Sequence, residues 1–560
     1  MGGVAGAAVR IGKAMAIVCS TIQSGVQATN ATITNARSVD GRIFSTLFIM
    51  HQSDRYEPKF ARLTARLAEI SDIEAAISLL KWDRATYMPP GAAAARGQQL
   101  ATLEQIAHQK FTDLTIAQLL EDLRPYEKSL PPNSREARLL RVTRRDYESA
   151  IRVPSRFLAR FSACQTEGYA AWVRAKSESD FSLVRSHLER MLDLCRERAS
   201  FFPEFESVAD PLIDIYDPGM TVKTIRPLFS QLRDRLVPMV NAIADSPPID
   251  DGFLQQPFGE EQQLNFCHKV LERIGYNYDR GRSDLSPHPF TSSPSVDDVR
   301  VTTRVYPNPT QAIFSSLHEM GHALYEQNID RALMRSPLGT GTSSGMHEAQ
   351  ARFWENIIGR SRAFWECFFP WLQGMFLREL NQVVVGDFYR AINKVERSLI
   401  RTDADELTYN LHVIIRFDLE VAMLEGKIAI ADLPDAWNER YRQDLGIVPP
   451  DDRLGVLQDV HWYGFGIGGL FQGYTLGNLI ATQLYESLLK TNPGISVDIE
   501  QGHFQPLLEW FRKNIYRHGR KFSTSELLQQ VTGKPLHIDP FVSYIEEKYT
   551  ALYSTNSQSF

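Results

Sequence analysis

Cysteine is scarce in this sequence, and no two cysteines stand close together. The 560 residues contain an odd number of them, with no C-x-x-C pair: Cys19, Cys164, Cys195, Cys267 and Cys367. This usage excludes a disulfide framework of the kind that supports small secreted domains. We expect a reduced, intracellular protein, cytoplasmic in the first instance, whose thiols are free and buried in the core.

Long apolar runs and a dominant charge sign are also missing. No stretch reaches the roughly 18 consecutive apolar residues of a membrane helix. The 61 Lys and Arg nearly balance the 67 Asp and Glu, which leaves a net charge of -6. A strongly basic protein would be expected if nucleic acid or an acidic membrane surface were the main partner. We therefore predict no nucleic-acid partner and no membrane association.

The N-terminal stretch lacks acidic residues altogether. Residues 1–39 contain Arg10, Lys13 and Arg37 but no Asp or Glu, and they are rich in Ala, Ser and Thr. This composition is typical of an organelle transit peptide, so organelle import is the alternative to a cytoplasmic location. The stretch could equally be a disordered tail, or the start codon could be assigned upstream of the true one, with Met50 as a candidate.

Helical periodicity dominates the remainder of the sequence. Ile73, Ile77 and Leu80 mark one amphipathic helix that stops before Pro89-Pro90-Gly91. Further helices are predicted at about residues 92–108, after Asn133 or Ser134 as the N-cap, and at 155–202, 221–244, 363–400 and 406–425. With 43% hydrophobic residues and no clear linker, the chain is long enough to bury one large core. We predict a mainly α protein.

Residues 277–309 break the helical pattern. Val299, Val301, Thr303 and Val305 alternate with polar or aromatic residues, which predicts a short strand or hairpin. This small sheet precedes the most informative motif and could offer an edge to an extended peptide. A hairpin that only covers the core is equally compatible with the pattern.

The motif His318-Glu319-Met320-Gly321-His322 indicates a metal-dependent hydrolytic site. On a helix, two histidines four residues apart lie one turn apart on the same face, where neutral imidazoles can hold one metal ion beside Glu319. A catalytic zinc needs a third protein ligand and an open position for water. We predict Glu348 as the third metal ligand, because it lies in the first turn of a helix predicted after a Gly-, Ser- and Thr-rich loop. Glu326 and Glu355 are expected to support the ligands or to be solvated.

Six short motifs occur in the order found in one peptidase family. They are His288-Pro289-Phe290, Asp298-Val299-Arg300-Val301-Thr302, His318 to His322, His347-Glu348-Ala349-Gln350, Ile400-Arg401-Thr402-Asp403-Ala404-Asp405, and the segment Gly455 to Trp462. Each motif is weak alone, but the ordered set is specific. From about Tyr56 to Leu552 the chain resembles the carboxypeptidase Taq family of metallocarboxypeptidases.

The resemblance implies a fold, a cofactor and a set of site residues. It implies one large helical domain with a deep active-site groove, a small β-sheet or hairpin next to the zinc helix, and a homodimer. The implied metal ligands are His318, His322 and Glu348, with Glu319 as general base, and the cofactor is one Zn2+ per chain that Co2+ can replace. The expected organisation is an N-terminal extension at 1–55, disordered or targeting, a catalytic domain at 56–552, and a C-terminal tail at 553–560.

Two departures from the family pattern are visible. Ala349 follows Glu348 where the family has Ser or Gly, a change that should not disturb metal binding. Residues 468–478 read Gly-Gly-Leu-Phe-Gln-Gly-Tyr-Thr-Leu-Gly-Asn, whereas many members have Gly-Tyr-Phe-Pro-x-Tyr-Thr-Leu-Gly-Asn. The second difference leaves open the role of Tyr474 and the detailed shape of the substrate pocket.

Four residues are candidates for contacts with the substrate. His461 and Tyr474 could donate hydrogen bonds to a tetrahedral oxyanion, although His461 could also be a packed histidine beside Trp462. Arg401 could grip a free C-terminal carboxylate through two parallel hydrogen bonds, and Arg300 is the competing choice.

Neighbouring residues could support these contacts. Asp403 and Asp405 could orient Arg401 or a zinc histidine, or all three could form an ordinary ion-pair cluster between helices. His288, between Pro287 and Pro289, could face the cleft or cap the sheet.

Three functions remain open on the sequence. The leading one is a metal-dependent carboxypeptidase that releases C-terminal amino acids from peptides with a free C-terminus. The second is a zinc endopeptidase or dipeptidyl-type peptidase that uses the same ligands in an open groove. The third, an inactive binding scaffold, fits poorly with an intact set of metal ligands and a base.

Overall fold

The structure, a computed structural model, describes the backbone of residues 32–553 and the side chains of residues 56–553. Residues 1–31 of the predicted N-terminal extension and residues 554–560 of the predicted C-terminal tail therefore lie outside the described residues. The backbone of residues 32–55 is helical and continues without a break into the predicted catalytic domain as part of α2. Within the described part, helices dominate and one small sheet is present, so the predicted mainly α fold is confirmed.

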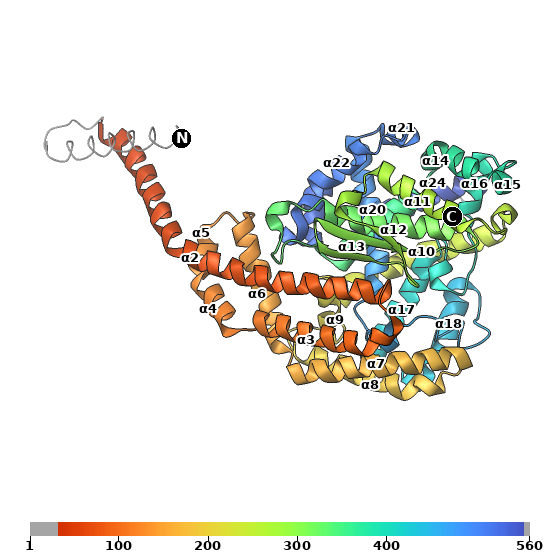
Figure 1. Cartoon of the computed structure of the whole chain (residues 1–560), viewed down its shortest axis with the longest axis horizontal. Coiled ribbons are helices and arrows are strands. Elements are labelled where there is room, and N and C mark those ends of the chain that lie inside the picture. The colour runs from red at the N-terminus through yellow and green to blue at the C-terminus, as the bar shows by residue number, and fades with distance from the viewer. Residues whose placement is uncertain (1–31, 554–560) are drawn as a thin grey trace.

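The first third of the described chain is entirely helical. It comprises α2 (Thr32–Ala85), η1 (Pro90–Ala92), α3 (Ala93–Phe111), α4 (Leu114–Asp122), α5 (Arg124–Ser129), α6 (Arg135–Arg152), α7 (Ser155–Glu178) and α8 (Ser182–Ser200). Figure 1 shows α2 running across the molecule above α3, with α7 and α8 side by side along its base. The predicted N-cap Ser134 is confirmed, since its hydroxyl accepts a hydrogen bond from the Ala137 amide.

The middle of the chain holds the small sheet and the metal-motif helix. Its elements are α9 (Asp210–Tyr216), α10 (Val222–Ala244), η2 (Gly252–Leu254), α11 (Glu260–Ile274), η3 (Tyr278–Arg280), β1 (Ser283–Leu285), β2 (Thr291–Ser295), β3 (Asp298–Thr303), α12 (Pro309–Gln327), η4 (Arg331–Leu333), α13 (Ser344–Arg352) and the π-helical turn η5 (Phe353–Ile358). The predicted helix at 221–244 corresponds to α10.

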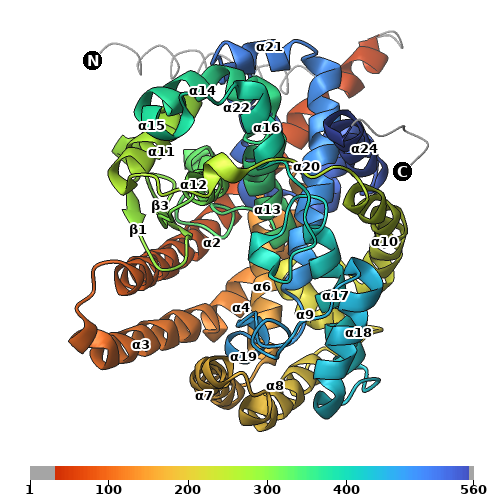
Figure 2. The same ribbon diagram turned by 90° about the vertical axis from the view of Figure 1, so that its right-hand side faces the viewer.

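The last part of the chain is again helical. It comprises α14 (Arg362–Met375), α15 (Leu377–Leu380), α16 (Val385–Ile392), η6 (Arg401–Asp403), α17 (Tyr409–Leu424), η7 (Ile430–Asp432), α18 (Leu433–Leu445), α19 (His461–Gly464), α20 (Phe471–Thr491), α21 (Ile495–Glu500), α22 (Gln505–Asn514), η8 (Tyr516–Lys521), α23 (Thr524–Thr532) and α24 (Asp539–Tyr553). Figure 2 shows α20 descending through the middle of the molecule beside α13.

Two predicted long helical stretches are interrupted. The stretch at 155–202 consists of α7 and α8, because Ser179 adopts a left-handed conformation (φ 55°) that ends α7, and the Asp180 carboxylate then accepts a hydrogen bond from the Ser182 amide at the start of α8. The stretch at 363–400 breaks into α14, α15 and α16, and residues 393–400 are not helical. In both places the chain turns back to pack against its neighbours.

The predicted strand is the centre of a three-stranded sheet in the order β1-β3-β2. β1 pairs parallel with β3 (Ser283 opposite Val301), and β2 pairs antiparallel with it (Thr291 opposite Val301). Val299 and Val301 are buried, as the alternating pattern requires. The sheet packs on α12, and α2 contacts β2 on the other side.

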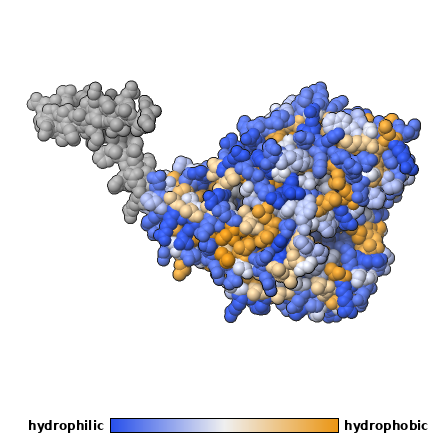
Figure 3. Space-filling model, viewed as in Figure 1, coloured by the Kyte–Doolittle hydropathy of each residue, from blue (hydrophilic) through white to orange (hydrophobic). Residues whose placement is uncertain are grey.

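One large hydrophobic core runs through the described residues, and Trp354 and Trp365 are among its fully buried side chains. On the face drawn in Figure 3, hydrophilic residues dominate and hydrophobic residues form small separate patches. Among the described helices, none is both long and apolar enough to cross a membrane. Cys267 is buried and Cys367 is half-buried, and no disulfide joins the described cysteines.

Candidate metal centre and active-site cleft

Helices α12 and α13 bring the three predicted metal ligands together. His318 and His322 lie one turn apart on α12, and Nε2 of each is 3.8 Å from the Glu348 carboxylate on α13. One ligand atom from each residue lies within 4.8 Å of the other two. Two imidazoles and a carboxylate at this separation can surround one divalent cation and leave a position free for water.

Two glycines allow the helices to approach closely enough for this geometry. A Cβ on Gly321, between the two histidines, would lie 2.6 Å from the Ala351 Cα of α13. A Cβ on Gly477 of α20 would lie 2.5 Å from the Glu348 Cγ. Because real Cβ atoms are not found at such distances, both glycines are required for Glu348 to sit between α12 and α20.

The His318 imidazole is oriented by a second carboxylate. Its Nδ1 is 2.9 Å from Glu355 Oε2, which leaves Nε2 for the metal. Arg352 donates hydrogen bonds to Glu348 (2.7 Å) and to Glu355 (3.3 Å) and so compensates both buried charges. Burial alone would raise the pKa of Glu355, but Arg352 and His318 outweigh burial and lower it to about 2. Glu355, expected to be supporting or solvated, supports His318.

A three-residue chain orients the His322 imidazole. Its Nδ1 is 2.7 Å from His347 Nδ1, and His347 Nε2 is 2.8 Å from Glu326 Oε1. A metal on His322 Nε2 requires the proton on Nδ1. His322 then donates to His347, and His347 donates to Glu326. The Glu326 carboxylate also accepts bonds from the Gly341 amide (2.9 Å) and the Ser293 hydroxyl (2.9 Å).

We expect His347→Ala to weaken the metal affinity of the protein by about 10- to 100-fold, because the tautomer and ring orientation of His322 lose their support. Competition with a chelator of known affinity measures this change. At saturating metal, kcat should fall much less than the affinity does. His503→Ala removes an exposed histidine and serves as the control; equal metal affinity in the two variants would contradict the role of His347.

Glu319 is held close to the ligands by the small sheet. The hydroxyl of Thr291, on β2, donates a 2.7 Å hydrogen bond to Glu319 Oε2. Glu319 is buried, and burial raises the pKa of its carboxyl group. The other carboxylate oxygen, Oε1, has no hydrogen-bond partner among the described residues. The carboxylate is therefore fixed at one oxygen and able to exchange a proton at the other.

The metal ligands and Glu319 line one open cleft of about 660 Å3. The other walls come from α9 and its loop, the segment 288–293, the loop before α13, and α20. Its lining residues are Ile215, Tyr216, Pro218, His288, Pro289, Phe290, Thr291, Ser293, His318, Glu319, His322, Glu326, Gly341, Thr342, Ser343, Ser344, His347, Glu348, Tyr474 and Arg520. His288 and Tyr474, two sequence candidates, thus lie in the same cleft as the metal ligands.

Arg401 lies beside Tyr474, and its guanidinium group is held by Asp459. Its Nε and Nη2 donate to the two carboxylate oxygens of Asp459 (3.1 and 2.8 Å), and Nη1 donates to the Tyr409 hydroxyl (3.1 Å). The guanidinium carbon is 5.1 Å from the centre of the Tyr474 ring. Arg401 is buried and does not itself line the cleft.

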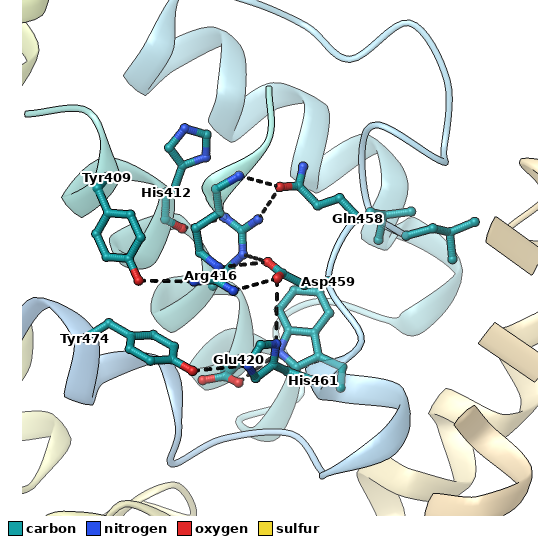
Figure 4. Close-up of polar contacts among 12 residues, drawn as sticks. Tyr409, His412, Arg416, Glu420, Gln458, Asp459, His461 and Tyr474 are labelled. Carbon is teal, nitrogen blue, oxygen red and sulfur yellow. Dashed lines mark hydrogen bonds and ion pairs between the residues drawn. The ribbon is translucent and has the colours of Figure 1, made fainter. Parts of the chain in front are cut away.

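Asp459 connects two arginines with His461. Figure 4 shows its carboxylate between Arg416 and His461, with the Tyr474 hydroxyl on the far side of the imidazole. Arg416 donates to Asp459, His461 Nδ1 is 3.6 Å from it, and His461 Nε2 is 3.2 Å from the Tyr474 hydroxyl. Burial alone would raise the pKa of Asp459, but Arg401 and Arg416 hold it well below the usual value.

His461 and Tyr474 are both uncharged near neutral pH. Burial lowers the pKa of His461, and burial raises the pKa of Tyr474 above its usual value. The pair therefore presents neutral hydrogen-bond donors and acceptors at the edge of the cleft. His461 packs against Phe471 and lies beside Trp462, so it is both a packed side chain and a neighbour of the site.

The remaining sequence candidates lie elsewhere. Arg300 on β3 binds Asp298 through two hydrogen bonds (2.7 and 2.9 Å), and it lies over the Trp82 ring. Asp405 accepts bonds from the start of α17 and forms no ion pair with Arg401. The Asp403 carboxylate accepts a hydrogen bond from the Thr402 hydroxyl (3.4 Å) and forms no ion pair with a described residue. Neither aspartate holds Arg401, because Asp459 occupies that position.

Several neighbours of the site were not identified from the sequence. His347, Thr291 and Asp459 each contact a candidate residue from a separate segment of the chain, and Arg352 contacts Glu348 from one turn further along α13. His347 and Asp459 belong to two of the six family motifs, and that membership was the available signal for them. For Arg352 the signal was its spacing, four residues after Glu348 on a predicted helix, whereas nothing in the local pattern around Thr291 indicates that it reaches Glu319.

Comparisons with known proteins agree with this geometry. The carboxypeptidase Taq (M32) metallopeptidase family matches residues 62–549. The chain is 38% identical over 506 residues to thermostable carboxypeptidase 1 of Thermus thermophilus. The matched region covers 88% of this chain and 98% of that protein. It is 34% identical to carboxypeptidase 1 of Bacillus subtilis over 500 residues, 89% of this chain and 99% of that one.

Solved structures give the same result. The M32 carboxypeptidase of Deinococcus radiodurans superposes with a TM-score of 0.86 at 44% identity and covers 89% of this chain and 100% of its own. Metallocarboxypeptidase 1 of Trypanosoma cruzi has a TM-score of 0.84 at 30% identity, with 88% and 99% covered. The chain therefore belongs to the carboxypeptidase Taq (M32) family and is a metal-dependent carboxypeptidase.

Proposed function

We propose that the chain holds one Zn2+ on His318, His322 and Glu348 and releases C-terminal amino acids from peptides, with Glu319 as the general base. The observation that carries this proposal is the arrangement of two imidazoles and a carboxylate around one point, with Glu319 in the same cleft. This donor set is the one that catalytic zinc sites use, and Co2+ can take a similar site.

The bound metal would supply a Lewis acid that activates a water molecule and polarises the scissile carbonyl. Glu319 Oε1 would accept the proton of the attacking water and pass it to the leaving amine. Thr291 keeps Oε2 in place during both transfers. Burial raises the pKa of Glu319, which makes the carboxylate a stronger base.

Tyr474 would donate to the developing oxyanion, and His461 would position the Tyr474 hydroxyl. Tyr474 lines the cleft, and its uncharged hydroxyl can donate either to His461 or to a substrate oxygen. His461 Nε2 lies behind that hydroxyl, and the adjacent Asp459 carboxylate favours the tautomer with the proton on Nδ1. Donors placed where negative charge develops are worth several kcal/mol in a dry site, typically about 3 to 4.

Arg401 would recognise the C-terminal carboxylate of the substrate. Asp459 uses the Nε and Nη2 edge of Arg401, and Tyr409 accepts one hydrogen bond from Nη1, so one N–H each on Nη1 and Nη2 is left for a second carboxylate. Because Arg401 lies behind Tyr474, a small movement of that ring would be needed for contact. Arg300 is less suited, since it is bound to Asp298 on the sheet and does not line the cleft.

The proposal is tested with matched peptides that carry a free or an amidated C-terminus. The free peptide should lose one residue at a time, and the amidated one should be cut at least about 100-fold more slowly, because a charge-assisted contact is lost. A chelator should abolish cleavage of both the free and the amidated peptide, and added Zn2+ should restore it. Equal cleavage of the two peptides would favour the alternative, an endopeptidase or dipeptidyl-type peptidase with the same ligands.

Assembly and location are also part of the proposal. We infer a homodimer in the cytoplasm, on the family resemblance and on the reduced, well-separated cysteines. Residues 1–55, of which 32–55 form the first part of α2, would be an extension outside the catalytic domain at 56–552 and a candidate import signal, and residues 553–560 would be a tail. Light scattering of the purified protein and the location of full-length and shortened fusions in cells test these points.

A further inference from the structure

A second, strongly basic cavity opens beside the catalytic cleft. Its volume is about 270 Å3, and its charged lining residues are Arg138, Arg141, Arg145, Arg520, Lys521 and Glu526. We call it the basic pocket. It shares the residues Pro218, Thr342, Ser343 and Arg520 with the cleft. The two cavities are therefore adjacent to each other along these four residues.

The positive charges of the basic pocket exceed the carboxylates that face them. Arg138 is paired with Glu526 (2.7 Å), and Arg145 and Arg520 share Asp146 (3.0 and 2.9 Å). Arg141 and Lys521 form no ion pair with any described residue. Glu526 and Asp146 thus pair with three of the five lining cations, and the lining of this small concavity is mainly positive.

Lys521 shows the effect of this crowding. Burial lowers its pKa, the nearby Arg138 and Arg517 lower it further, and Glu136 and Asp330 offset only part of this effect. An anion in the basic pocket would offset that repulsion, since opposite charge favours the protonated amine. The arginines would remain charged and could bind an oxyanion through their N–H groups.

Uncharged donors complete the basic pocket. The Ser343 hydroxyl, 2.8 Å from the Thr524 hydroxyl, lies at the start of α13, and Thr524 begins α23. Both helices contain nine residues and direct their amino-terminal ends toward this cavity. The Gly345 amide of α13 already donates to Asp217, and the Glu526 amide of α23 donates to Ser523. The hydroxyls and the cations are therefore the groups suited to a carboxylate or phosphate oxygen.

We propose that the basic pocket binds an oxyanion, and that in catalysis this is the side-chain carboxylate of an acidic residue upstream of the scissile bond in the substrate peptide. This inference rests on the proposed carboxypeptidase function, because the peptide must lie in the shared cleft. A free phosphate ion offers the same chemistry from a second source. The pocket would then give the enzyme a preference for acidic peptides.

A scan of synthetic peptides tests the preference. A hexapeptide of alanines with a free C-terminus receives a single Glu, or a single Lys, at each position before the last. One Glu position should raise kcat/KM by a factor on the order of five at low salt, the size expected of a partly exposed ion pair, and the gain should shrink at high salt. The corresponding Lys peptide should be cut more slowly than the alanine peptide.

Charge reversal identifies the pocket. Arg141→Glu combined with Lys521→Glu should remove or invert the Glu preference and leave hydrolysis of the alanine peptide within a factor of about two. Lys128→Glu reverses an exposed charge outside the pocket and should change neither value. Thermal melting verifies that the variants are folded. An unchanged Glu preference in the double variant would overturn the assignment.

Inorganic phosphate separates the two sources of the oxyanion. Competitive inhibition of the Glu peptide by phosphate, with little effect on the alanine peptide, supports one site for both. Calorimetry then measures phosphate binding directly. If phosphate binds the native protein but not the double variant, and the peptides show no Glu preference, the pocket is a site for a free anion. If all peptides were cut at equal rates and phosphate did not bind, the inference would be refuted. If the alanine peptide were not cut at all, the proposed carboxypeptidase function would be refuted, and phosphate binding alone would then test the pocket.

Discussion

Glu319→Gln is expected to retain one metal ion per chain and to lose kcat/KM by a factor of about 10⁴. Gln keeps the size of the side chain and can still contact Thr291, but it cannot accept a proton from water. The three metal ligands are untouched, so metal content should stay near that of the native protein. Metal analysis of the dialysed variant and hydrolysis of a free peptide provide the two measurements.

His322→Ala gives the complementary result. It removes one of the three proposed metal ligands and should release the metal on dialysis. The peptidase activity should fall in proportion to the metal that is lost. Glu319 would remain in place in this variant, held by Thr291. Full activity in the Gln variant, or native metal affinity in the His322 variant, would each contradict the roles assigned to these residues. The two variants together separate metal binding from proton transfer.

The local features of this site were predictable because they depend on spacing within one helix. The four-residue spacing of His318 and His322 places both imidazoles on one face whatever the rest of the fold does. Glu348 required a further assumption, that the next helix returns to the first. The close contacts at Gly321 and Gly477 show how that return is achieved, since only a residue without a Cβ fits at either point.

The supporting residues could not be predicted in the same way. Asp459 reaches Arg401 across 58 positions of sequence, while Asp405, only four positions away, caps a helix instead. A carboxylate close in sequence is therefore a poor guide to the partner of a buried arginine. The path of the chain after a loop determines which side chains come into contact. The breaks after Ser179 and near Phe376 have a similar origin, since a helical pattern continues in sequence past the residue at which packing turns the chain.

Arg401→Ala is expected to lower kcat/KM for peptides with a free C-terminus by a factor on the order of 10² or more. Amidated peptides should lose much less, because they lack the carboxylate that Arg401 would bind. The fold should tolerate the change, since Asp459 keeps Arg416 as a charged partner. Steady-state kinetics on both peptide forms supply the comparison, and the ratio of the two losses is the informative quantity.

Two further variants locate the effect. Asp459→Asn keeps Arg401 but removes the charge that fixes its Nε and Nη2 edge, so it should reduce the discrimination between free and amidated peptides without removing the metal. Arg300→Ala breaks a pair on β3 outside the cleft and should change kcat/KM by no more than a factor of about two. If Arg401→Ala slowed both peptide forms equally, Arg401 would act by supporting Tyr474 and His461. A large loss in the Arg300 variant would instead move carboxylate recognition to the sheet.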